Sequence, residues 1–379
     1  MSEITAEKST RNASIDHAKA IAIILMVLLH TTSRYDLMSN LVNSFHMAIF
    51  FIIGGMFSKP ENTFWITLKK SFFQLIIPYI VFSFVALSIC WISPRIHPEF
   101  YPGLNSLREI LKAAVIGIFI APDYYTGYAF LPLGPLWFLL ALFWNRLLFS
   151  VWCTNHAKDN WVIRIVPKLS VALIVAGVMY YKPIFMSLNG ASIAFPFFLI
   201  GYYGKTLILK LPSLSVYTRI AVIIICSIFM LSFTDMIAYA AGVIQGNVII
   251  AYMRGLVGSL LLLIICSFIV SIPKLSKLSN YLSIIGASTI TILCLHFHFI
   301  YPLKVIYKLL LSGDPGNIHI MFALTVSLCI VIVLTYLHGY LNSRIPIIVG
   351  KGVKRPIRDD GNKVTKLLGD HGGAVDGNG

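Results

Sequence analysis

The sequence predicts an all-α polytopic membrane helix bundle of about ten transmembrane helices, with both termini in the cytosol. Of the 379 residues, 58% are hydrophobic and only 12% are charged, whereas about 25% of the residues of a soluble domain are charged. The apolar residues form long blocks, and a block of about 18 or more apolar residues is typical of a bilayer-spanning helix. The basic residues collect between these blocks, as they do in membrane proteins.

Ten apolar blocks define the expected spans. They lie at 15–33, 42–58, 71–92, 134–153, 165–181, 190–208, 217–238, 247–271, 281–303 and 318–341. The segment 109–121 is short for a span, and we interpret it as an interfacial or re-entrant part of the long connection 93–133. The chain thus divides into a cytosolic N-terminal segment (1–14), a transmembrane domain (15–341) and a basic, then Gly-rich tail (342–379), which we expect to be disordered.

The distribution of positive charge sets the expected orientation. With the N-terminus inside, 20 of the Lys and Arg residues fall in cytosolic segments and 7 in outer segments. This excess on the cytosolic side favours the orientation, and it would weaken if 109–121 crossed the membrane. The net charge of +15 is therefore explained by a lipid bilayer and does not predict a nucleic-acid partner. The six cysteines are scattered without C-x-x-C spacing, so neither a zinc site nor a disulfide framework is expected.

Ionisable side chains in the first span carry the strongest functional signal. Lys19 and His30 are eleven residues apart, which places them on one helix face about 16 Å apart along the axis. Asp16 lies one turn before Lys19 on nearly the same face. Such groups are costly inside a bilayer and mark either function or a buried partner. In one interpretation, the amine of Lys19 and the imidazole of His30 are functional groups. In the other, a snorkelling Lys19 pairs with Asp16, and the ring of His30 has its hydrogen-bond partners within the bundle.

Further histidines lie in the outer half of the bundle. His46 is near the outer end of the second span, so its ring could share a cavity with the histidine of the first span or could simply be interfacial. Gly54 and Gly55 permit a close approach of another helix. His296 and His298 are two residues apart and cannot share one helix face, and we favour His296 as the central one.

The remaining polar candidates each have a structural alternative. Arg254 could bind substrate or could be neutralised by Asp235. Trp137 could stack on a sugar or could belong to the aromatic belt of the membrane interface. Lys69 and Lys70 could hold a phosphate-bearing donor, although contact with anionic lipid heads is the simpler interpretation. No Gly-rich phosphate loop, Ser-centred elbow or clustered set of metal ligands is visible, so we expect no metal.

Several motifs together resemble one family. The run IDHAKAIAIILMVLLH resembles the first-helix motif of the acyltransferase-3 membrane proteins, an acidic residue followed by Arg or Lys and then, eleven positions later, by His. SFHMAIFF is similar to the second helix of the fucose 4-O-acetylase-like branch. PLWFLLALF and LCLH also fit, so the resemblance covers most of residues 12–341. The sequence departs from the pattern at Ala20, Ala48 and Gly54, and none of these changes removes an ionisable group.

The resemblance implies a membrane O-acetyltransferase of the bacterial inner membrane. It would move an acetyl group from cytosolic acetyl-CoA, with no bound cofactor, to a hydroxyl of an envelope polysaccharide or lipid-linked glycan. A histidine without a metal suits general-base work on a hydroxyl. The residues alone leave one alternative, a transporter or flippase for a sugar or small solute. The expected site residues are His30, Lys19, His46 and Asp16 for catalysis, and Trp137, Arg254 and His296 for substrate binding.

Overall fold

The computed structural model describes most of the expected helical domain. It covers residues 12–32, 37–59, 64–96, 136–152, 168, 171–172, 175, 187–239, 243–311 and 320–351. The segment 109–121, most of the expected span 165–181 and most of both terminal segments lie outside the described residues, so the predictions made for them stay predictions.

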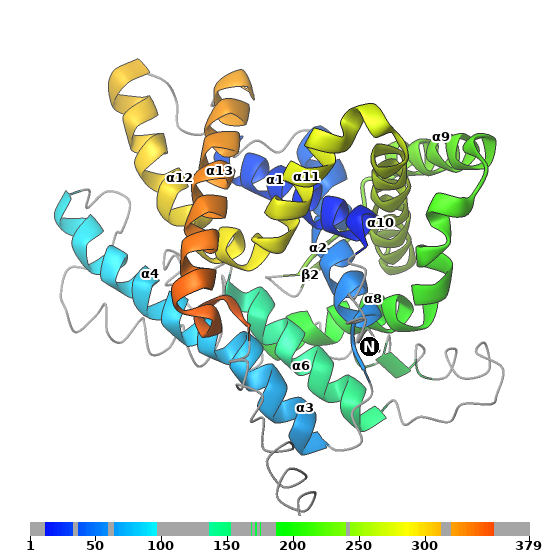
Figure 1. Ribbon diagram of the computed structural model, residues 1–379, viewed down its shortest axis with the longest axis horizontal. Helices are drawn as coiled ribbons and strands as arrows, with labels where there is room; N and C mark the ends of the chain where they lie inside the picture. Colours follow the sequence, from blue (N-terminus) through cyan, green and yellow to red (C-terminus); the bar gives the residue numbers. More distant parts are fainter. Residues whose placement is uncertain are drawn as a thin grey trace, which may run out of the picture.

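Helices dominate the described part of the chain (Figure 1). The α-helices are α1 (Ala13–Thr32), α2 (Leu37–Met56), α3 (Phe64–Ser71), α4 (Ile77–Ile96), α6 (Trp137–Trp152), α8 (Leu188–Leu209), α9 (Val216–Ser232), α10 (Val248–Ser271), α11 (Ser276–Ala287), α12 (Thr289–Leu311) and α13 (Ile320–Arg344). A π-helical turn, η1 (Phe72–Ile76), joins α3 to α4, and 3-10 turns form η6 (Leu211–Ser213), η7 (Pro273–Leu275) and η8 (Pro346–Val349). The strands are β1 (Met236–Ala238) and β2 (Val243–Gln245).

Length and composition identify the helices that can cross a membrane. Within the described residues six stretches qualify, or up to seven if one bent pair counts as a single span. Two further apolar helices, α6 and α9, are shorter than the usual span of about 20 residues. The chain is therefore a multi-pass helical membrane protein, while the expected total of about ten spans and the cytosolic termini stay predictions. The six stretches are α1, α2, Phe64–Ala86, Leu188–Ser213, α10 and α13.

Asparagine side chains start two of the long helices. The Asn12 Oδ1 accepts hydrogen bonds from the backbone N–H groups of Ser14 (3.1 Å) and Ile15 (3.4 Å) at the start of α1. The Asn247 side chain does the same for Ile249 and Ile250 at the start of α10. These caps satisfy N–H groups that have no partner within the helix, and they fix where each apolar block becomes a helix.

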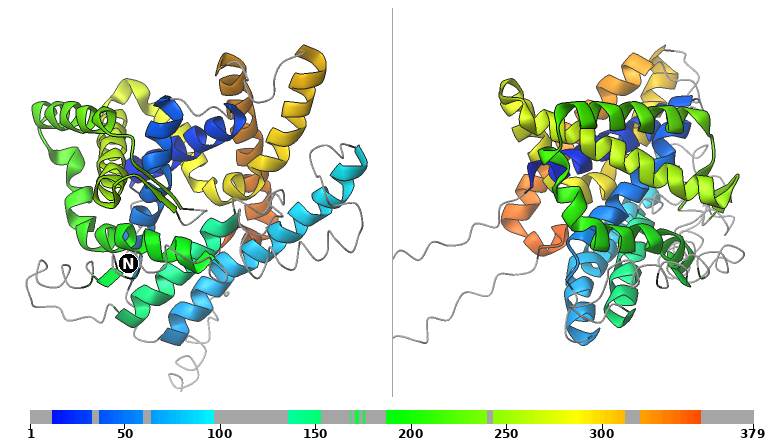
Figure 2. Two further views of the ribbon diagram at one scale, coloured as in Figure 1. Left: turned by 180° about the vertical axis from the view of Figure 1, so that it is seen from behind. Right: turned by 90° about the vertical axis from the view of Figure 1, so that its right-hand side faces the viewer.

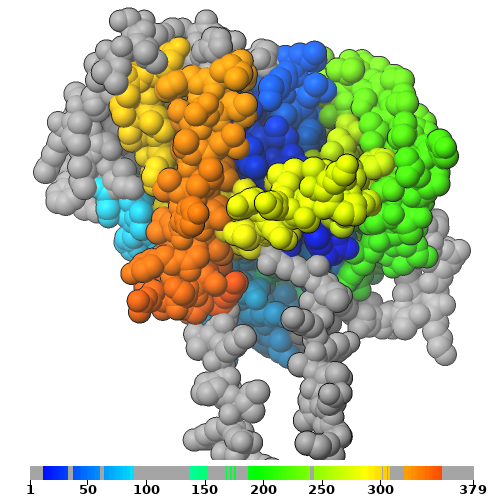
Figure 3. All heavy atoms as spheres, turned by 45° about the horizontal axis from the view of Figure 1, so that its top comes forward, coloured from blue at the N-terminus to red at the C-terminus, as the bar shows by residue number. Residues whose placement is uncertain are grey.

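The expected span 281–303 is not one straight helix. It consists of the end of α11 and most of α12, which meet at a bend of 79°. α11 lies across α1, as Figure 3 shows for the yellow and dark blue segments. Gly286 makes this contact possible, because a Cβ there would lie only 2.8 Å from the backbone carbonyl carbon of Asp16. His17 adds a second contact, with its Nε2 2.9 Å from the carbonyl oxygen of Ser279.

A reciprocal pair of glycines joins α2 to α8. A Cβ at Gly55 would lie 2.8 Å from the carbonyl carbon of Phe198, and a Cβ at Gly201 would lie 2.6 Å from that of Ile52. Ordinary van der Waals contact begins at about 3.4 Å, so the two backbones touch where side chains would otherwise separate them. The close helix approach predicted for the Gly54–Gly55 pair is confirmed at Gly55.

The expected span 217–238 ends earlier than predicted. α9 stops at Ser232, and β1 then pairs antiparallel with β2 in the register Met236↔Gln245. The turn into α10 needs Gly246, whose φ of +85° favours glycine, and the Asp235 carboxylate accepts a hydrogen bond from the Asn247 backbone N–H beside it. The described part of the chain is thus mostly helical, as the all-α prediction requires, with this two-stranded hairpin as an addition that was not expected. Figure 2 shows α9 and α10 side by side.

Candidate functional site

Three histidines from three different helices lie near one another. The ring centroids of His30 on α1 and His296 on α12 are 5.4 Å apart, with 31° between the ring planes. Phe297 covers the same side of His30, with centroids 4.6 Å apart. His46 lies on α2, and α1 packs against both α2 and α12. The fold thus brings together imidazoles that are far apart in the sequence.

Backbone carbonyls orient two of these rings in the same way. The Nδ1 of His46 lies 3.0 Å from the carbonyl oxygen of Val42, and the Nδ1 of His296 lies 3.0 and 2.9 Å from those of Ile292 and Leu293. A carbonyl only accepts hydrogen bonds, so in the neutral ring Nδ1 carries the hydrogen and Nε2 keeps its lone pair. The Nε2 of His296 is buried and has no hydrogen-bond partner among the described residues. A ring held in this way can accept a proton from a hydroxyl.

His296 and His298 occupy different positions on α12. His296 is fully buried and faces His30, whereas His298 is only partly buried. The Nε2 of His298 also lacks a partner within the described part of the chain. The ring that meets His30 is therefore the one that the sequence analysis favoured, although its role in binding substrate stays a prediction.

Asp16 and Lys19 form an ion pair at the start of α1. The Lys19 Nζ is 2.6 Å from an Asp16 oxygen, and the two side chains are 22% and 5% exposed, respectively. The nearly buried carboxylate thus holds a more accessible amine at the opposite end of α1 from His30. This is the pairing that the structural interpretation of Lys19 foresaw. It also positions a cation where a donor could reach it, so the contribution of the pair to catalysis stays a prediction.

Trp137 lies inside an aromatic cluster. Its side chain is 6% exposed and stacks on Tyr239, with an interplanar angle of 8° and centroids 6.5 Å apart. Phe51 lies 6.3 Å away on another side. Burial of this kind does not match a residue of the interfacial belt. Sugar stacking by Trp137 stays a prediction, and the cluster adds a group that the sequence did not single out, the buried Tyr239 hydroxyl, which has no hydrogen-bond partner among the described residues.

Arg254 joins three segments of the backbone. It is fully buried, and its guanidinium donates to the carbonyl oxygens of Asp235 (2.6 Å) and Met230 (3.2 Å) and to the Asn40 side chain (2.9 Å). The carboxylate of Asp235 accepts from the backbone of Asn247. Arg254 thus contacts the end of α9, the residue before β1 and the first turn of α2. These contacts give it a structural role, and the substrate-binding role predicted for it remains untested.

A second polar group was not foreseen from the sequence. Arg146 on α6 donates a hydrogen bond of 2.7 Å to the Gln74 side chain on η1. The sequence does contain a signal for this residue. Arg146 lies within the apolar run FWNRLLF, and an ionisable residue inside a span is a functional candidate by default.

These features together define a class of protein. Long apolar helices surround buried imidazoles, two of which, His30 and His296, face each other. A family model described as an acyltransferase domain matches residues 12–337. The chain therefore belongs to the acyltransferase-3 family and is a membrane acyltransferase. Comparisons with curated proteins and with solved structures give no match.

Proposed function

We propose that this acyltransferase is an O-acetyltransferase of the bacterial inner membrane, similar to the fucose 4-O-acetylase-like branch. It takes the acetyl group from cytosolic acetyl-CoA and places it on a hydroxyl of an envelope polysaccharide or lipid-linked glycan. The observation that carries the proposal is the His30–His296 pair, with centroids 5.4 Å apart and a buried His296 Nε2 that has no partner in the described part of the chain.

The chemistry assigns His30 the role of general base. In the net reaction the acceptor hydroxyl gives its proton to the imidazole, and its oxygen bonds to the carbonyl carbon of the thioester. The carbon–sulfur bond breaks, and the departing thiolate takes up a proton, so the products are an O-acetyl ester and the free thiol of coenzyme A. His296 stands beside His30, and His46 lies on α2, which packs against α1. A positive charge on one ring disfavours a charge on its neighbour, which favours passing the proton on.

The donor end of the reaction is assigned to Lys19 and Asp16. Along α1, Lys19 lies about 16 Å and Asp16 about 21 Å from His30, on the side that the charge distribution assigns to the cytosol. A thioester on a long flexible arm can have its charged head near Lys19 and its carbonyl near the imidazoles. In this proposal the donor lies on the cytosolic side of the membrane and the acceptor hydroxyl lies towards the outer side.

Histidine substitutions test the assignment directly. His30→Ala and His296→Ala should each abolish acetyl transfer, measured as thiol release from acetyl-CoA by purified protein with a glycan acceptor. The matched control is His338→Gln, because His338 on α13 is also a buried membrane histidine but bonds to Thr291 (2.8 Å), more than one helical turn before His296 on α12. Mass spectrometry of envelope polysaccharide should show the loss of one acetyl group per modified sugar. Full activity of His30→Ala at normal abundance would refute the mechanism.

A transporter or flippase is the second candidate function. The bent helix pair α11–α12 favours it, because broken helices line substrate sites in many transporters. Solute flux through proteoliposomes without thiol release would support transport. Thiol release that depends on a glycan acceptor would exclude transport as the main activity.

A further inference from the structure

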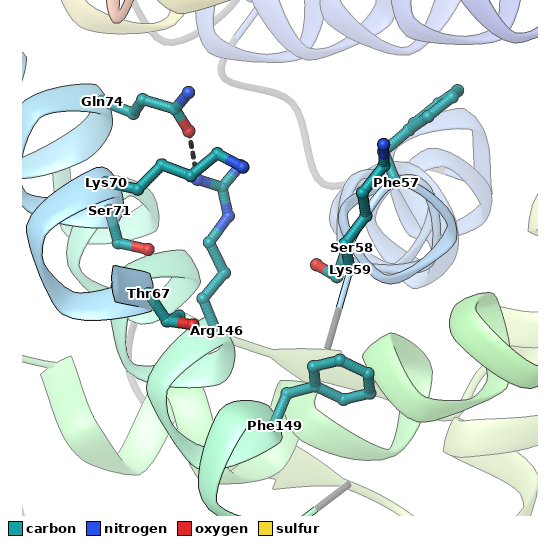
Figure 4. A pocket seen from close by; sticks show the side chains of 9 residues that line it. All are labelled: Phe57, Ser58, Lys59, Thr67, Lys70, Ser71, Gln74, Arg146 and Phe149. Carbon is teal, nitrogen blue, oxygen red and sulfur yellow. Dashed lines mark hydrogen bonds between the residues drawn. The ribbon is translucent and has the colours of Figure 1, made fainter. Parts of the chain in front are cut away.

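A polar cavity lies away from the histidines, where the end of α2 meets α3, η1 and α6. Its volume is about 240 Å³, far more than a single water molecule needs. Figure 4 shows the end of α2 on one side, the residues of α3 and η1 on the other, and Arg146 between them. The lining residues are Phe57, Ser58, Lys59, Thr67, Lys70, Ser71, Gln74, Arg146 and Phe149.

The lining is rich in positive charge and hydrogen-bond donors. Lys70 on α3, Arg146 on α6 and Lys59, which follows the end of α2, all reach it. No carboxylate belongs to the lining that the structure describes. The Arg146 guanidinium is fixed by one of its N–H groups, which bonds to the neutral Gln74 side chain at 2.7 Å. That bond orients the guanidinium without neutralising it, and an oriented guanidinium suits the oxygens of a phosphate.

The hydroxyl of Thr67 gives independent support for a ligand site in the cavity. Its side chain is 8% exposed, and its hydroxyl is buried without a hydrogen-bond partner among the described residues. Buried hydroxyls are nearly always hydrogen-bonded in native proteins, so an oxygen acceptor within the cavity would give the Thr67 hydroxyl its hydrogen bond. The π-helical turn η1 begins directly after Ser71, and such turns occur frequently at functional sites.

The position of the cavity matches the donor side of the proposed reaction. α2 ends at Met56, ten residues and about 15 Å beyond His46. The cavity therefore stands about as far along α2 from the histidines as Lys19 stands along α1. That separation suits a donor whose phosphates and thioester are joined by a long arm, as they are in coenzyme A.

We propose that this cavity binds the phosphate groups of the acyl-CoA donor, with Arg146, Lys70 and Lys59 as the cationic contacts and Thr67 as a hydroxyl donor. The inference rests on the proposed function, which supplies the donor, and it assigns the phosphate subsite to residues outside the first-helix motif. A phospholipid headgroup carries the same phosphate chemistry, so the experiment must separate the two sources.

Calorimetric titration of purified protein in nanodiscs of phosphatidylcholine tests the assignment without turnover. Coenzyme A is compared with pantetheine, which has the arm and thiol but no phosphate. Arg146→Gln should weaken the binding of coenzyme A about tenfold or more and leave pantetheine binding unchanged. Lys70→Gln, a change at an exposed side chain that should not affect folding, should weaken coenzyme A binding several-fold. Lys277→Gln, which changes an exposed lysine on α11 outside the cavity, should have no effect.

The outcomes are distinguishable from failure of the proposed function. Unchanged coenzyme A affinity in both Arg146→Gln and Lys70→Gln would overturn the subsite and leave acetyl transfer intact. Loss of co-purified phospholipid in Arg146→Gln, seen by native mass spectrometry, with unchanged coenzyme A affinity would assign the cavity to lipid and overturn the inference. If wild-type protein binds inorganic pyrophosphate at Arg146 but does not bind coenzyme A, the assignment of acyl-CoA as the donor is overturned, and with it the proposed function.

Discussion

Replacing Gly55 by alanine should force α2 and α8 apart. The new Cβ would lie 2.8 Å from the carbonyl carbon of Phe198 and closer still to its oxygen, so the backbones must separate by at least 0.6 Å to reach the 3.4 Å of ordinary contact. For Gly201→Ala the corresponding distance to Ile52 is 2.6 Å, and the shift is at least 0.8 Å. Overpacking of this kind costs about 1–3 kcal/mol, which exceeds the ~1 kcal/mol that alanine contributes over glycine within a helix.

A glycine on α13 provides the matched control. Among the described residues, no atom outside the local backbone of α13 lies within 4 Å of the position where a Cβ would be added at Gly339. Gly339→Ala should therefore be neutral or stabilise the protein by up to ~1 kcal/mol. Thermal unfolding in detergent, followed by tryptophan fluorescence, should rank Gly55→Ala and Gly201→Ala several degrees below Gly339→Ala. The double variant should lose less than the sum of the single losses, because the first substitution already separates the helices. A Gly55→Ala protein as stable as Gly339→Ala would refute the close contact.

Three further predictions concern single side chains and use the same unfolding assay. Arg254→Met leaves buried carbonyls and an amide without their donor, so it should destabilise the protein by ~3 kcal/mol or more; a wild-type unfolding temperature would contradict this. Tyr239→Phe removes a hydroxyl that has no partner within the described residues, and stability should stay the same or rise by ~1 kcal/mol. A clear loss of stability would show that the hydroxyl has a partner. Asn247→Ala removes the cap of α10 and should cost ~1 kcal/mol; no change would mean that the cap is dispensable.

Helix positions were predictable wherever an apolar block has polar ends. The expected span 247–271 agrees with α10, Val248–Ser271, because Asn247 marks its start. The bend at Ser288 was not predictable, since the part of the block 281–303 around Ser288 has neither proline nor a charged residue and the bend accompanies the docking of α11 on α1. The hairpin was missed for a similar reason. Its apolar strands resemble the end of a helix, and the hydrogen bond from Asn247 to Asp235 that closes the turn is a tertiary contact.

The candidate site was predictable in its residue types but not in its contacts. Helical spacing placed Lys19 and His30 on one face, and the cost of burying charge singled out the intramembrane histidines. Nothing in the local pattern could show that His30 meets His296, because that contact depends on how α1 and α12 pack. Arg146 was overlooked because its partner Gln74 is 72 residues away in the sequence and belongs to a π-helical turn.

The docking of α11 on α1 also sets when the start of the first helix can become ordered. The carbonyl of Asp16 rests against Gly286, and His17 bonds to Ser279, 262 residues later in the chain. During synthesis from the N-terminus, the face of α1 that packs on α11 is therefore covered only after most of the polypeptide has been made. An incomplete chain that ends before α11 keeps that face of the Asp16–Lys19 pair exposed. The packing around the Asp16–Lys19 pair is thus completed late in biogenesis. Truncated products should be open to quality-control proteolysis at their first helix.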